Sequence, residues 1–365
     1  MSDNYIPVYQ PTLVGNEKRY TSECLESGWI SSRGKYVSLF EGAFASLLNI
    51  NYATTVSNGT VALHLALKTL GIGFGDEVIV PTFTYIASVN AIAYVGATPV
   101  FVDAEPETWN IDVSLVEQKI TPRTKAIMAV HLYGAVCAMD ELQLLCRRHN
   151  LLLIEDVAEA FGSQHKGRYA GSFGDIATFS FFGNKTITTG EGGMVVSNDQ
   201  ATIQRAAYLK SQAVSPNREY WHDEIGFNYR MTNICAAIGL AQLEQVNTII
   251  DSKRSIAEWY HEELAGLPLT FQAEASDTLH TYWMVSILAE NMAVRDNIRQ
   301  ALNRAGVETR PLFFPAHTMP VFKMDEVFPV AETLSARGIN LPSFNTLTRE
   351  QVRYICAEIR GVVHA

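Results

Sequence analysis

The chain has 365 residues, of which 47% are hydrophobic and 18% are charged, and its formal net charge is −10. This composition is typical of a folded globular protein and excludes extensive disorder, and the length allows more than one domain. The acidic excess argues against a nucleic-acid partner, because phosphate backbones attract surfaces rich in Lys and Arg. A phosphorylated small molecule needs only a local group of hydrogen-bond donors and is compatible with this charge.

Five cysteines are scattered along the chain without a CxxC pair, so the sequence indicates neither a metal site nor a disulfide framework. Reduced thiols, mostly buried, are the simpler interpretation. The first residues, MSDNYIPVYQP, lack a basic segment followed by an apolar run. No apolar stretch approaches the roughly 20 residues needed to span a bilayer. We therefore expect a cytoplasmic protein with no membrane partner.

From about residue 50 to residue 200, short β-rich runs alternate with helical patterns. The predicted strands are Ala53–Ser57, Glu77–Val80, Pro99–Val102, Lys125–Val130, Leu151–Glu155, Ile176–Ser180 and Gly193–Ser197. The predicted helices between them are Thr60–Leu70, Ala87–Val95 and Met139–His149. Apolar strands that alternate with helices favour an α/β fold, in which a mostly parallel sheet is covered on both faces. Ligands of such sheets bind at the carboxyl ends of the strands.

After about residue 200 the pattern changes. Apolar residues at helical spacing predict a helix over Asn233–Val246, and further helical or apolar runs cover Ser252–Leu264, Tyr282–Leu288, Arg295–Ala305 and Arg349–Arg360. We interpret residues 1–246 as a large domain and residues 247–365 as a smaller α/β domain.

Lys185 lies in the segment FSFFGNKTITTGEGGMVVS, after a predicted strand that ends near Ser180 and before a glycine-rich turn. A lysine at a strand end can point into a cleft. Partial loss of solvent there lowers the pKa of the amine and makes it a nucleophile for an aldehyde. For this segment taken alone, a surface lysine in a loop is the alternative.

The segment LLLIEDVAE has four apolar residues followed by Glu155 and Asp156, as expected of a buried strand with a carboxylate at its carboxyl end. Such an anion can keep the ring nitrogen of a pyridoxal cofactor protonated, so that the ring withdraws electrons from a substrate. Asp156 suits this role better than Glu155. Capping of the following helix is the alternative for Asp156.

The segment Ser57–Thr60, SNGT, lies between a predicted strand and a predicted helix. Backbone N–H groups and hydroxyls at a helix N-terminus bind anions, and Gly59 allows a phosphate to approach the backbone closely. Ser180 can add a further hydroxyl to the same phosphate. A simple helix cap is the alternative for SNGT.

The segment PTFTY directly follows the predicted strand Glu77–Val80. An aromatic ring at the carboxyl end of a strand, here Tyr85, can stack on a planar cofactor. Ala158 is small enough to pack against the opposite face of that cofactor. An ordinary core or surface aromatic is the alternative for Tyr85.

The order of these features along the chain is more specific than any one of them: anion loop, aromatic, acidic strand end, lysine. In this order the sequence resembles the DegT/DnrJ/EryC1/StrS family, pyridoxal-phosphate-dependent nucleotide-sugar aminotransferases of fold type I. The resemblance covers nearly the whole chain. It is carried by SGWISSRGKYVSLFE, SNGTVALHLAL, PTFTY, VDAEPETWNID, HLYG, IEDVAEAFGS, FFGNKTITTGEGG, GFNYRMTNICAAIGLAQL, ETRPLFFPAH and LPSF.

The resemblance implies an aspartate aminotransferase-like fold: a mostly parallel, seven-stranded mixed sheet flanked by helices, with a smaller C-terminal α/β domain. It also implies pyridoxal 5'-phosphate as the cofactor, carried by Lys185 as a Schiff base. Asp156 corresponds to the partner of the pyridinium nitrogen and Tyr85 to the residue that stacks on the ring. The implied phosphate ligands are Gly59, Thr60 and Ser180.

Asn228, in the segment GFNYR, resembles a residue that reaches the phosphate from the second subunit. The resemblance therefore implies a homodimer with a shared active site. A turn residue before the helix at Asn233 is the alternative for Asn228.

Glu159 departs from the family pattern, because many members have Gln at this position, near the phenolic oxygen of the cofactor. A carboxylate beside a phenolate repels it unless one of them holds a proton. Lys185 itself is informative, since related sugar dehydratases have His at its position. A lysine there favours amino transfer over dehydration.

Two segments, FFGNKTITTGEGGMV and ETRPLFF, resemble the branch of the family that forms GDP-perosamine, a precursor of bacterial O-antigen. The substrates implied are L-glutamate and GDP-4-keto-6-deoxy-D-mannose. Arg310 is a candidate contact for the donor carboxylate or the sugar diphosphate, because a planar guanidinium suits both anions. Ser31, Arg33 and His317 are further candidates for the sugar-nucleotide pocket. A surface salt bridge is the alternative for Arg310, and the other three residues could equally be ordinary polar residues of the surface.

Three other functions stay open at this point. A UDP- or dTDP-linked ketosugar is an alternative substrate, with amination at carbon 3 or carbon 4. A dehydratase or epimerase on the same fold would use the same cofactor without net nitrogen transfer. A non-enzymatic pyridoxal-phosphate-binding regulator would need a basic arm or a helix-turn-helix pattern, and we find neither in the sequence.

Overall fold

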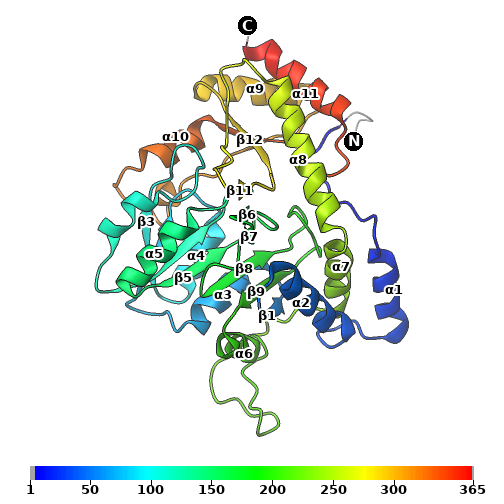
Figure 1. The fold of residues 1–365 in the computed structure, drawn as a ribbon, viewed down its shortest axis with the longest axis vertical. Coiled ribbons are helices and arrows are strands. Elements are labelled where there is room, and N and C mark those ends of the chain that lie inside the picture. Colours follow the sequence, from blue (N-terminus) through cyan, green and yellow to red (C-terminus); the bar gives the residue numbers. More distant parts are fainter. Residues whose placement is uncertain (1–4, 364–365) are drawn as a thin grey trace.

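The computed structural model describes residues 5–363 of the chain (Figure 1). The helices are α1 Glu17–Ser27, α2 Lys35–Leu48, α3 Gly59–Thr69, α4 Ile86–Tyr94, α5 Met139–His149, α6 Gln200–Leu209, α7 Asn233–Leu243, α8 Val246–Glu263, α9 Met292–Arg304, α10 Pro329–Arg337 and α11 Arg349–Val363, with 3-10 turns η1 Val113–Leu115, η2 Glu117–Lys119 and η3 Ala316–Thr318. The strands are β1 Tyr52–Val56, β2 Glu77–Pro81, β3 Thr98–Val102, β4 Thr124–Val130, β5 Leu152–Asp156, β6 Gln164–His165, β7 Arg168–Tyr169, β8 Ile176–Ser180, β9 Gly193–Ser197, β10 Thr270–Phe271, β11 Thr278–Leu279, β12 Val285–Leu288, β13 Arg310–Pro311 and β14 Gly338–Leu341.

Seven strands form the central sheet, in the order β1-β9-β8-β5-β4-β2-β3. The pairs from β8 to β3 are all parallel, whereas β9 runs antiparallel to both of its neighbours, β1 and β8. The sheet is therefore mixed and mostly parallel. The carboxyl ends of β1, β2, β4, β5 and β8 consequently meet at one edge, where ligands of such sheets bind.

Side chains of the central strands alternate between two apolar layers, as the period of a strand requires. In β4, Ala126, Met128 and Val130 face a core shared with α3, α4 and α6. Ile127 and Ala129 face a second core shared with α2, α5 and α7. Because both faces are covered, these strands consist of continuous apolar runs rather than a polar and apolar alternation.

A second, antiparallel sheet has the strand order β10-β12-β14-β13. It shares a third core with α8, α9 and α11, and Ile6 from the N-terminal segment is buried in the same core. Figure 1 shows α8 running from α7, beside the central sheet, to the layer that contains α9 and α11. A small three-stranded sheet, β11-β6-β7, lies between the two larger ones in this view.

The structure confirms the predicted fold class, and all seven predicted strands belong to the central sheet. The predicted helix over Asn233–Val246 ends at Leu243, and α8 begins at Val246 rather than at Ser252. The side chains of Val246 and Ile249 explain this earlier start, since both are buried. The domain boundary after residue 246 stays a prediction. No helix among residues 5–363 is long and apolar enough to cross a membrane.

Candidate active site

Lys185 lies at the edge of the central sheet where the parallel strands end. It follows β8 in a tight turn, in which its own N–H donates to the Phe182 carbonyl at 2.9 Å. Its side chain is only 12% exposed. The Nζ atom lies 3.7 Å from Glu159 Oε1 and 3.9 Å from the centre of the Trp283 ring. The lysine therefore points into the protein, not into solvent as the surface-loop alternative requires.

Asp156 is the last residue of β5 and is 4% exposed. The Ser88 hydroxyl donates to its Oδ2 atom at 2.7 Å, and the Ala158 N–H donates to Oδ1 at 3.1 Å. No α-helix begins after β5 before α6, so Asp156 does not cap one. These two bonds fix the carboxylate while leaving further lone pairs for a cationic partner.

Glu159 lies in the turn after β5, buried to 4% exposure. The Tyr133 N–H donates to its Oε2 atom at 3.1 Å, which directs Oε1 toward Lys185. Glu159 and Lys185 thus share one buried space. With Asp156 nearby, the structure brings together the three charged groups that the sequence predicted for this site.

Burial has opposite effects on the two groups of this pair. Burial raises the pKa of Glu159 to about 7, although the nearby Lys185 opposes the rise. Burial also lowers the pKa of Lys185, while the carboxylates of Glu159 and Asp156 oppose that change. Burial thus disfavours the charged form of both groups, which suits groups that must take up and release protons.

The N-terminus of α3 meets the end of β8. A Cβ atom on Gly59 would lie 2.6 Å from the Ser180 Cβ, so only glycine allows this approach. Asn58 caps the helix by accepting the Val61 N–H at 3.0 Å, and the N–H groups of Gly59 and Thr60 have no acceptor within the helix. The predicted phosphate ligands Gly59, Thr60 and Ser180 are therefore neighbours in the fold, at a helix end that favours anions.

Tyr85 is 56% exposed and precedes α4, so its ring is free to stack on a ligand. Its ring centre lies 5.7 Å from that of Phe313. Phe313 stacks on Tyr133 at 5.2 Å, and Tyr133 stacks on Trp283 at 6.1 Å. These rings form an aromatic wall, defined here as Tyr85, Phe313, Tyr133 and Trp283, that leads from the surface to Lys185.

Three members of this wall were not among the residues predicted from the sequence. Tyr133 and Phe313 lie inside the matched segments HLYG and ETRPLFFPAH, which was the available signal. Trp283 lies in no matched segment. Its indole N–H donates to the Asn184 carbonyl at 2.6 Å, so it contacts both the ammonium of Lys185 and the backbone next to it.

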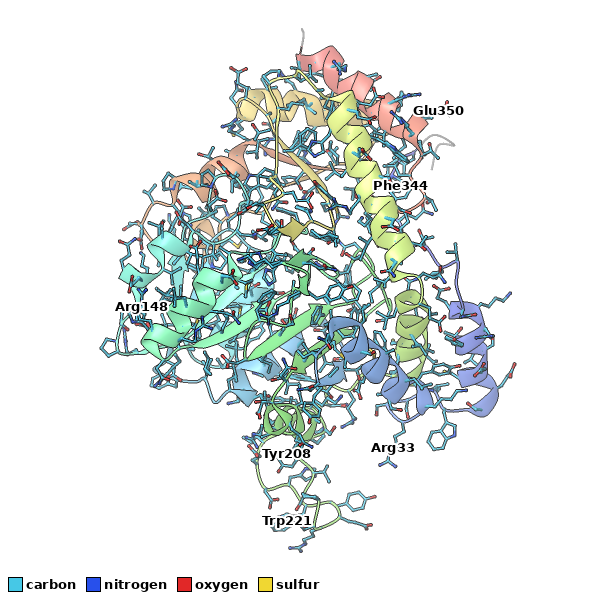
Figure 2. All side chains as sticks on the ribbon, in the orientation of Figure 1. Arg33, Arg148, Tyr208, Trp221, Phe344 and Glu350 are labelled. Atoms are coloured by element: carbon cyan, nitrogen blue, oxygen red, sulfur yellow. The ribbon has the colours of Figure 1, made fainter. Side chains whose placement is uncertain are left out.

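Asn228 is exposed and lies at the base of a projecting segment, residues 211–228, which carries Trp221 farther out (Figure 2). The Ser57 N–H donates to the Tyr229 carbonyl at 2.8 Å, so this base is anchored beside the SNGT loop. The Arg230 side chain donates to the Ser32 hydroxyl at 3.2 Å. The segments that contain Asn228 and Ser31 thus share one surface.

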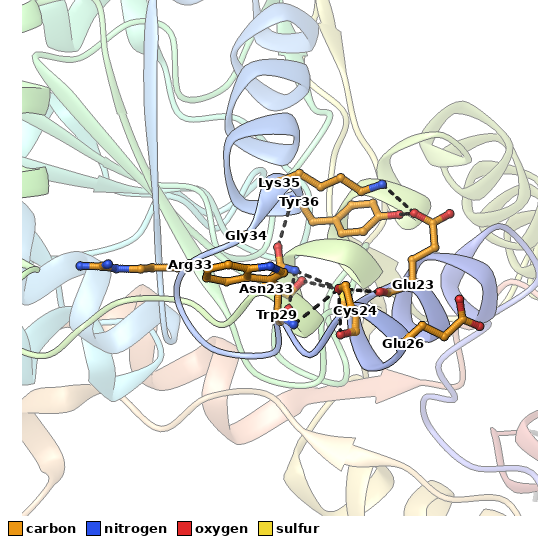
Figure 3. Close-up of a pocket in the computed structure, with 10 residues that line it drawn as sticks. Glu23, Cys24, Glu26, Trp29, Arg33, Gly34, Lys35, Tyr36 and Asn233 are labelled. Carbon is orange, nitrogen blue, oxygen red and sulfur yellow. Dashed lines mark hydrogen bonds and ion pairs between the residues drawn. The ribbon is translucent and has the colours of Figure 1, made fainter.

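Figure 3 shows a cavity of about 790 Å³ between the start of α2 and the helices α1 and α7. Asn233 organises it, since its Oδ1 accepts the Tyr36 N–H at 3.0 Å and its Nδ2 donates to the Trp29 carbonyl at 2.7 Å. Arg33 points away from this group of residues. The cavity is not lined by Lys185, Asp156 or Glu159, so it is not the space around the buried cluster.

The two remaining candidates differ in their surroundings. Arg310 is exposed, in the same segment as Phe313, and its Nη2 lies 3.4 Å from Glu308. His317 is 3% exposed, and both of its ring nitrogens are engaged, Nδ1 with Thr82 Oγ1 at 2.7 Å and Nε2 with Glu332 Oε1 at 3.2 Å. Arg310 is thus available to a ligand, whereas His317 joins η3 to the segment after β2.

The model of the DegT/DnrJ/EryC1/StrS aminotransferase family matches residues 11–360. The chain belongs to this family. A GDP-perosamine synthase of Escherichia coli O157:H7 is 60% identical over 97% of this chain and 98% of its own. A GDP-perosamine synthase of Vibrio cholerae is 53% identical over 98% of each chain. The protein is therefore a sugar aminotransferase.

Solved structures agree with this membership. DesV of S. venezuelae, in complex with a ketimine intermediate, has a TM-score of 0.91 and 34% identity over 96% of this chain and 95% of its own. The sugar aminotransferase Spr1654 of Streptococcus pneumoniae in its PLP form has a TM-score of 0.93 and 29% identity over 99% of each chain. The fold is thus that of pyridoxal-phosphate-dependent sugar aminotransferases.

The residues at the sheet edge fit this cofactor. The approach of Gly59 to Ser180 leaves helix N–H groups and hydroxyls for a phosphate, and the fixed carboxylate of Asp156 suits a protonated ring nitrogen. The amine of Lys185 suits the aldehyde. Among residues 5–363 we find no group of three or more His, Cys, Asp or Glu side chains that could hold a metal ion.

Proposed function

We propose that this aminotransferase uses pyridoxal 5'-phosphate to move an amino group from L-glutamate to GDP-4-keto-6-deoxy-D-mannose, which gives GDP-perosamine. The observation that carries the proposal is the buried Lys185, 3.7 Å from Glu159 at the edge where Asp156 and the SNGT loop also lie. The choice of sugar is supported by the two GDP-perosamine synthases that match over nearly their whole length.

The cofactor, when bound, supplies the electron sink that stabilises negative charge on the reacting carbon. Gly59, Thr60 and Ser180 would hold its phosphate, Lys185 would attach to its aldehyde, and Tyr85 would stack on its ring. The carboxylate of Asp156, fixed by Ser88, would face its ring nitrogen.

Lys185 is also the acid and base of the reaction. Its amine would remove a proton from the substrate carbon and return it at a different carbon. Burial lowers the pKa of Lys185, which favours the neutral form of its amine. Burial raises the pKa of Glu159 to about 7, so near neutral pH it carries less negative charge beside the cofactor than an ordinary carboxylate would.

We also propose that the enzyme is a cytoplasmic homodimer with a shared site. The surface around Ser31 and Asn228 carries exposed apolar side chains, including Trp29 at 57%, Ile30 at 48% and Leu25 at 65% exposure. A patch of this kind is typical of protein interfaces. Asn228 on this surface can reach a phosphate in the second subunit.

The proposal is tested with isotope-labelled L-glutamate and three 4-keto-6-deoxy nucleotide sugars, linked to GDP, UDP or dTDP. We expect labelled nitrogen in the GDP-linked aminosugar, detected by mass spectrometry, and little in the other two. Label in the UDP- or dTDP-linked product instead would overturn the sugar but keep the reaction. Loss of water without labelled product would indicate a dehydratase.

A further inference from the structure

The N-terminal segment Tyr5–Tyr9 connects the C-terminal core to the Lys185 turn. Ile6 is paired with the strand-like segment at Val307 through two backbone hydrogen bonds, its N–H to the Gly306 carbonyl at 3.0 Å and its carbonyl to the Glu308 N–H at 2.9 Å. Ile6 itself is buried in the C-terminal core. This end of the segment is therefore fixed to the C-terminal part of the chain.

The next residues of the segment are fixed to the same part. The Val8 N–H donates to Glu308 Oε2 at 3.0 Å, and the Val8 carbonyl accepts the Ser343 N–H at 3.0 Å. Ser343 in turn accepts two bonds from Lys253 Nζ, at 2.7 Å to its carbonyl and 3.2 Å to its hydroxyl. Lys253 is buried in α8, with its Nζ 5.4 Å from the centre of the Tyr9 ring.

Tyr9 is the point at which this segment touches the active site. Its hydroxyl donates to the backbone carbonyl of Lys185 at 2.5 Å. Its ring packs against both the C-terminal core and one of the two cores of the central sheet. In the preceding peptide unit, the Trp283 indole N–H donates to the Asn184 carbonyl. The backbone at Lys185 is thus held by two side chains from outside the central sheet.

We propose that Tyr9 is a positioning residue of the reaction, which fixes the Lys185 backbone from the N-terminal segment and so sets where the Lys185 amine lies. The inference rests on the proposed function, because it assigns a role to Tyr9 in that same site. The Tyr9 hydroxyl is bonded to the backbone carbonyl of Lys185, not to its amine, so Tyr9 acts only through the Lys185 backbone. Small displacements of a reacting group have large kinetic effects, since rates depend steeply on the approach of the reacting atoms.

The test compares Tyr9→Phe with Tyr5→Phe in the full-length, cofactor-loaded enzyme. Tyr5 is a matched control, because its hydroxyl belongs to the same segment but donates to Glu308 at 3.2 Å on the exposed side. We would measure kcat and KM for L-glutamate, the pH midpoint of the visible band of the lysine-bound cofactor, and the thermal unfolding temperature. The charged groups that face Lys185, and so contribute to that midpoint, are Glu159 and Asp156.

We expect Tyr9→Phe to lower kcat about tenfold with KM changed by less than about twofold, and to shift the pH midpoint. Tyr5→Phe should leave kcat, KM and the pH midpoint at their wild-type values. Equal kcat and equal midpoints in the two variants would contradict the inference, even if Tyr9→Phe unfolded at a lower temperature. If Tyr9→Phe fails to fold, Lys253→Met replaces it, with the same direction expected and wild-type kcat contradicting the inference.

Measurements on the wild-type enzyme distinguish a failure of the proposed function from a failure of the inference about Tyr9. Absence of a visible band in the loaded wild-type protein contradicts the proposed function, and this inference with it. A normal band and normal turnover in wild type, with Tyr9→Phe indistinguishable from Tyr5→Phe, contradicts the inference alone.

Discussion

Two regions of the candidate site differ in how completely one chain builds them. The inner region, defined as Lys185, Asp156 and Glu159, is buried, and its groups are fixed by neighbours from several parts of the same chain. The outer region, defined as Arg33, Asn228 and Arg310, is exposed on separate segments. The inner groups are therefore held in place by residues of a single chain. The outer groups lie on separate segments, and we propose that a second subunit or a substrate completes their site.

The largest expected effect concerns the inner region. Lys185→Ala removes the amine that attaches the cofactor and moves the proton, so we expect turnover to fall at least about 10⁴-fold. The visible band of the lysine-bound cofactor should disappear as well. A persistent band in this variant would mean that another lysine carries the cofactor. Lys253→Met, which removes a different buried lysine, is the control for the band alone and should keep the band even if its kcat falls.

Asp156→Asn tests whether the charge of this side chain, rather than its shape, matters. The amide can still accept the Ser88 hydroxyl, but it no longer balances a protonated ring nitrogen. We expect kcat to fall by about 10²–10³, the usual value of a fixed electrostatic partner in a buried site. A kcat within about threefold of wild type would show that Asp156 only supports the turn at Ala158.

Glu159→Gln tests the buried proton of the inner region. The folded protein keeps the Glu159 proton up to about pH 7, because burial raises its pKa from 4.5, whereas the unfolded chain releases it near 4.5. The folded state binds more protons in this window. The stabilising contribution is therefore complete below pH 4.5 and is lost as the pH rises through 7. We expect the free energy of unfolding of wild type to fall by about 2.5 kcal/mol relative to that of Glu159→Gln between pH 5 and pH 8.

Urea unfolding of both cofactor-free proteins at the two pH values measures this difference. Equal changes in the free energy of unfolding of wild type and Glu159→Gln would show that the proton is not held by Glu159.

Gly59→Ala tests the contact that forms the anion loop. The new Cβ would lie 2.6 Å from the Ser180 Cβ, so α3 and β8 must move apart, at a cost of about 1–3 kcal/mol. Cofactor affinity should fall with it, because the loop loses its geometry. The double variant Gly59→Ala with Ser180→Gly relieves the contact and should recover most of the stability. A lack of recovery would indicate a different source of strain.

The smallest effect concerns the outer region. Asn228→Ala should weaken cofactor binding about tenfold, the value of one hydrogen bond to a charged group. If the residue acts across subunits, unfolding and refolding a mixture of Lys185→Ala and Asn228→Ala should restore one complete site in each hybrid dimer. Activity above that of either variant alone is the expected result. No recovery would place Asn228 in the site of its own chain.

The difference between the inner and outer regions also shows which features could be predicted from the sequence. All seven central strands were predicted, and so was the grouping of Lys185, Asp156 and Glu159 at the sheet edge, because buried apolar runs and the polar residues at their ends leave a strong local pattern. The roles of these three residues stay predictions. Trp283 and Tyr9 were missed, since each reaches Lys185 from a distant segment and lies in no recognisable pattern. His317 was a candidate for the sugar-nucleotide pocket, and its hydrogen bonds to Thr82 and Glu332, 235 and 15 residues away along the chain, could not be predicted. Contacts between distant segments of this kind are not visible in local sequence.

The central claim, that Lys185 carries a cofactor which passes an amine from glutamate to a GDP-linked ketosugar, is tested most directly by one absorption experiment. The pure protein is loaded with pyridoxal 5'-phosphate, and its spectrum is recorded before and after L-glutamate and then after GDP-4-keto-6-deoxy-D-mannose. We predict that glutamate converts the visible band to a band in the near ultraviolet and that the ketosugar restores the visible band. A visible band that glutamate leaves unchanged would contradict the account.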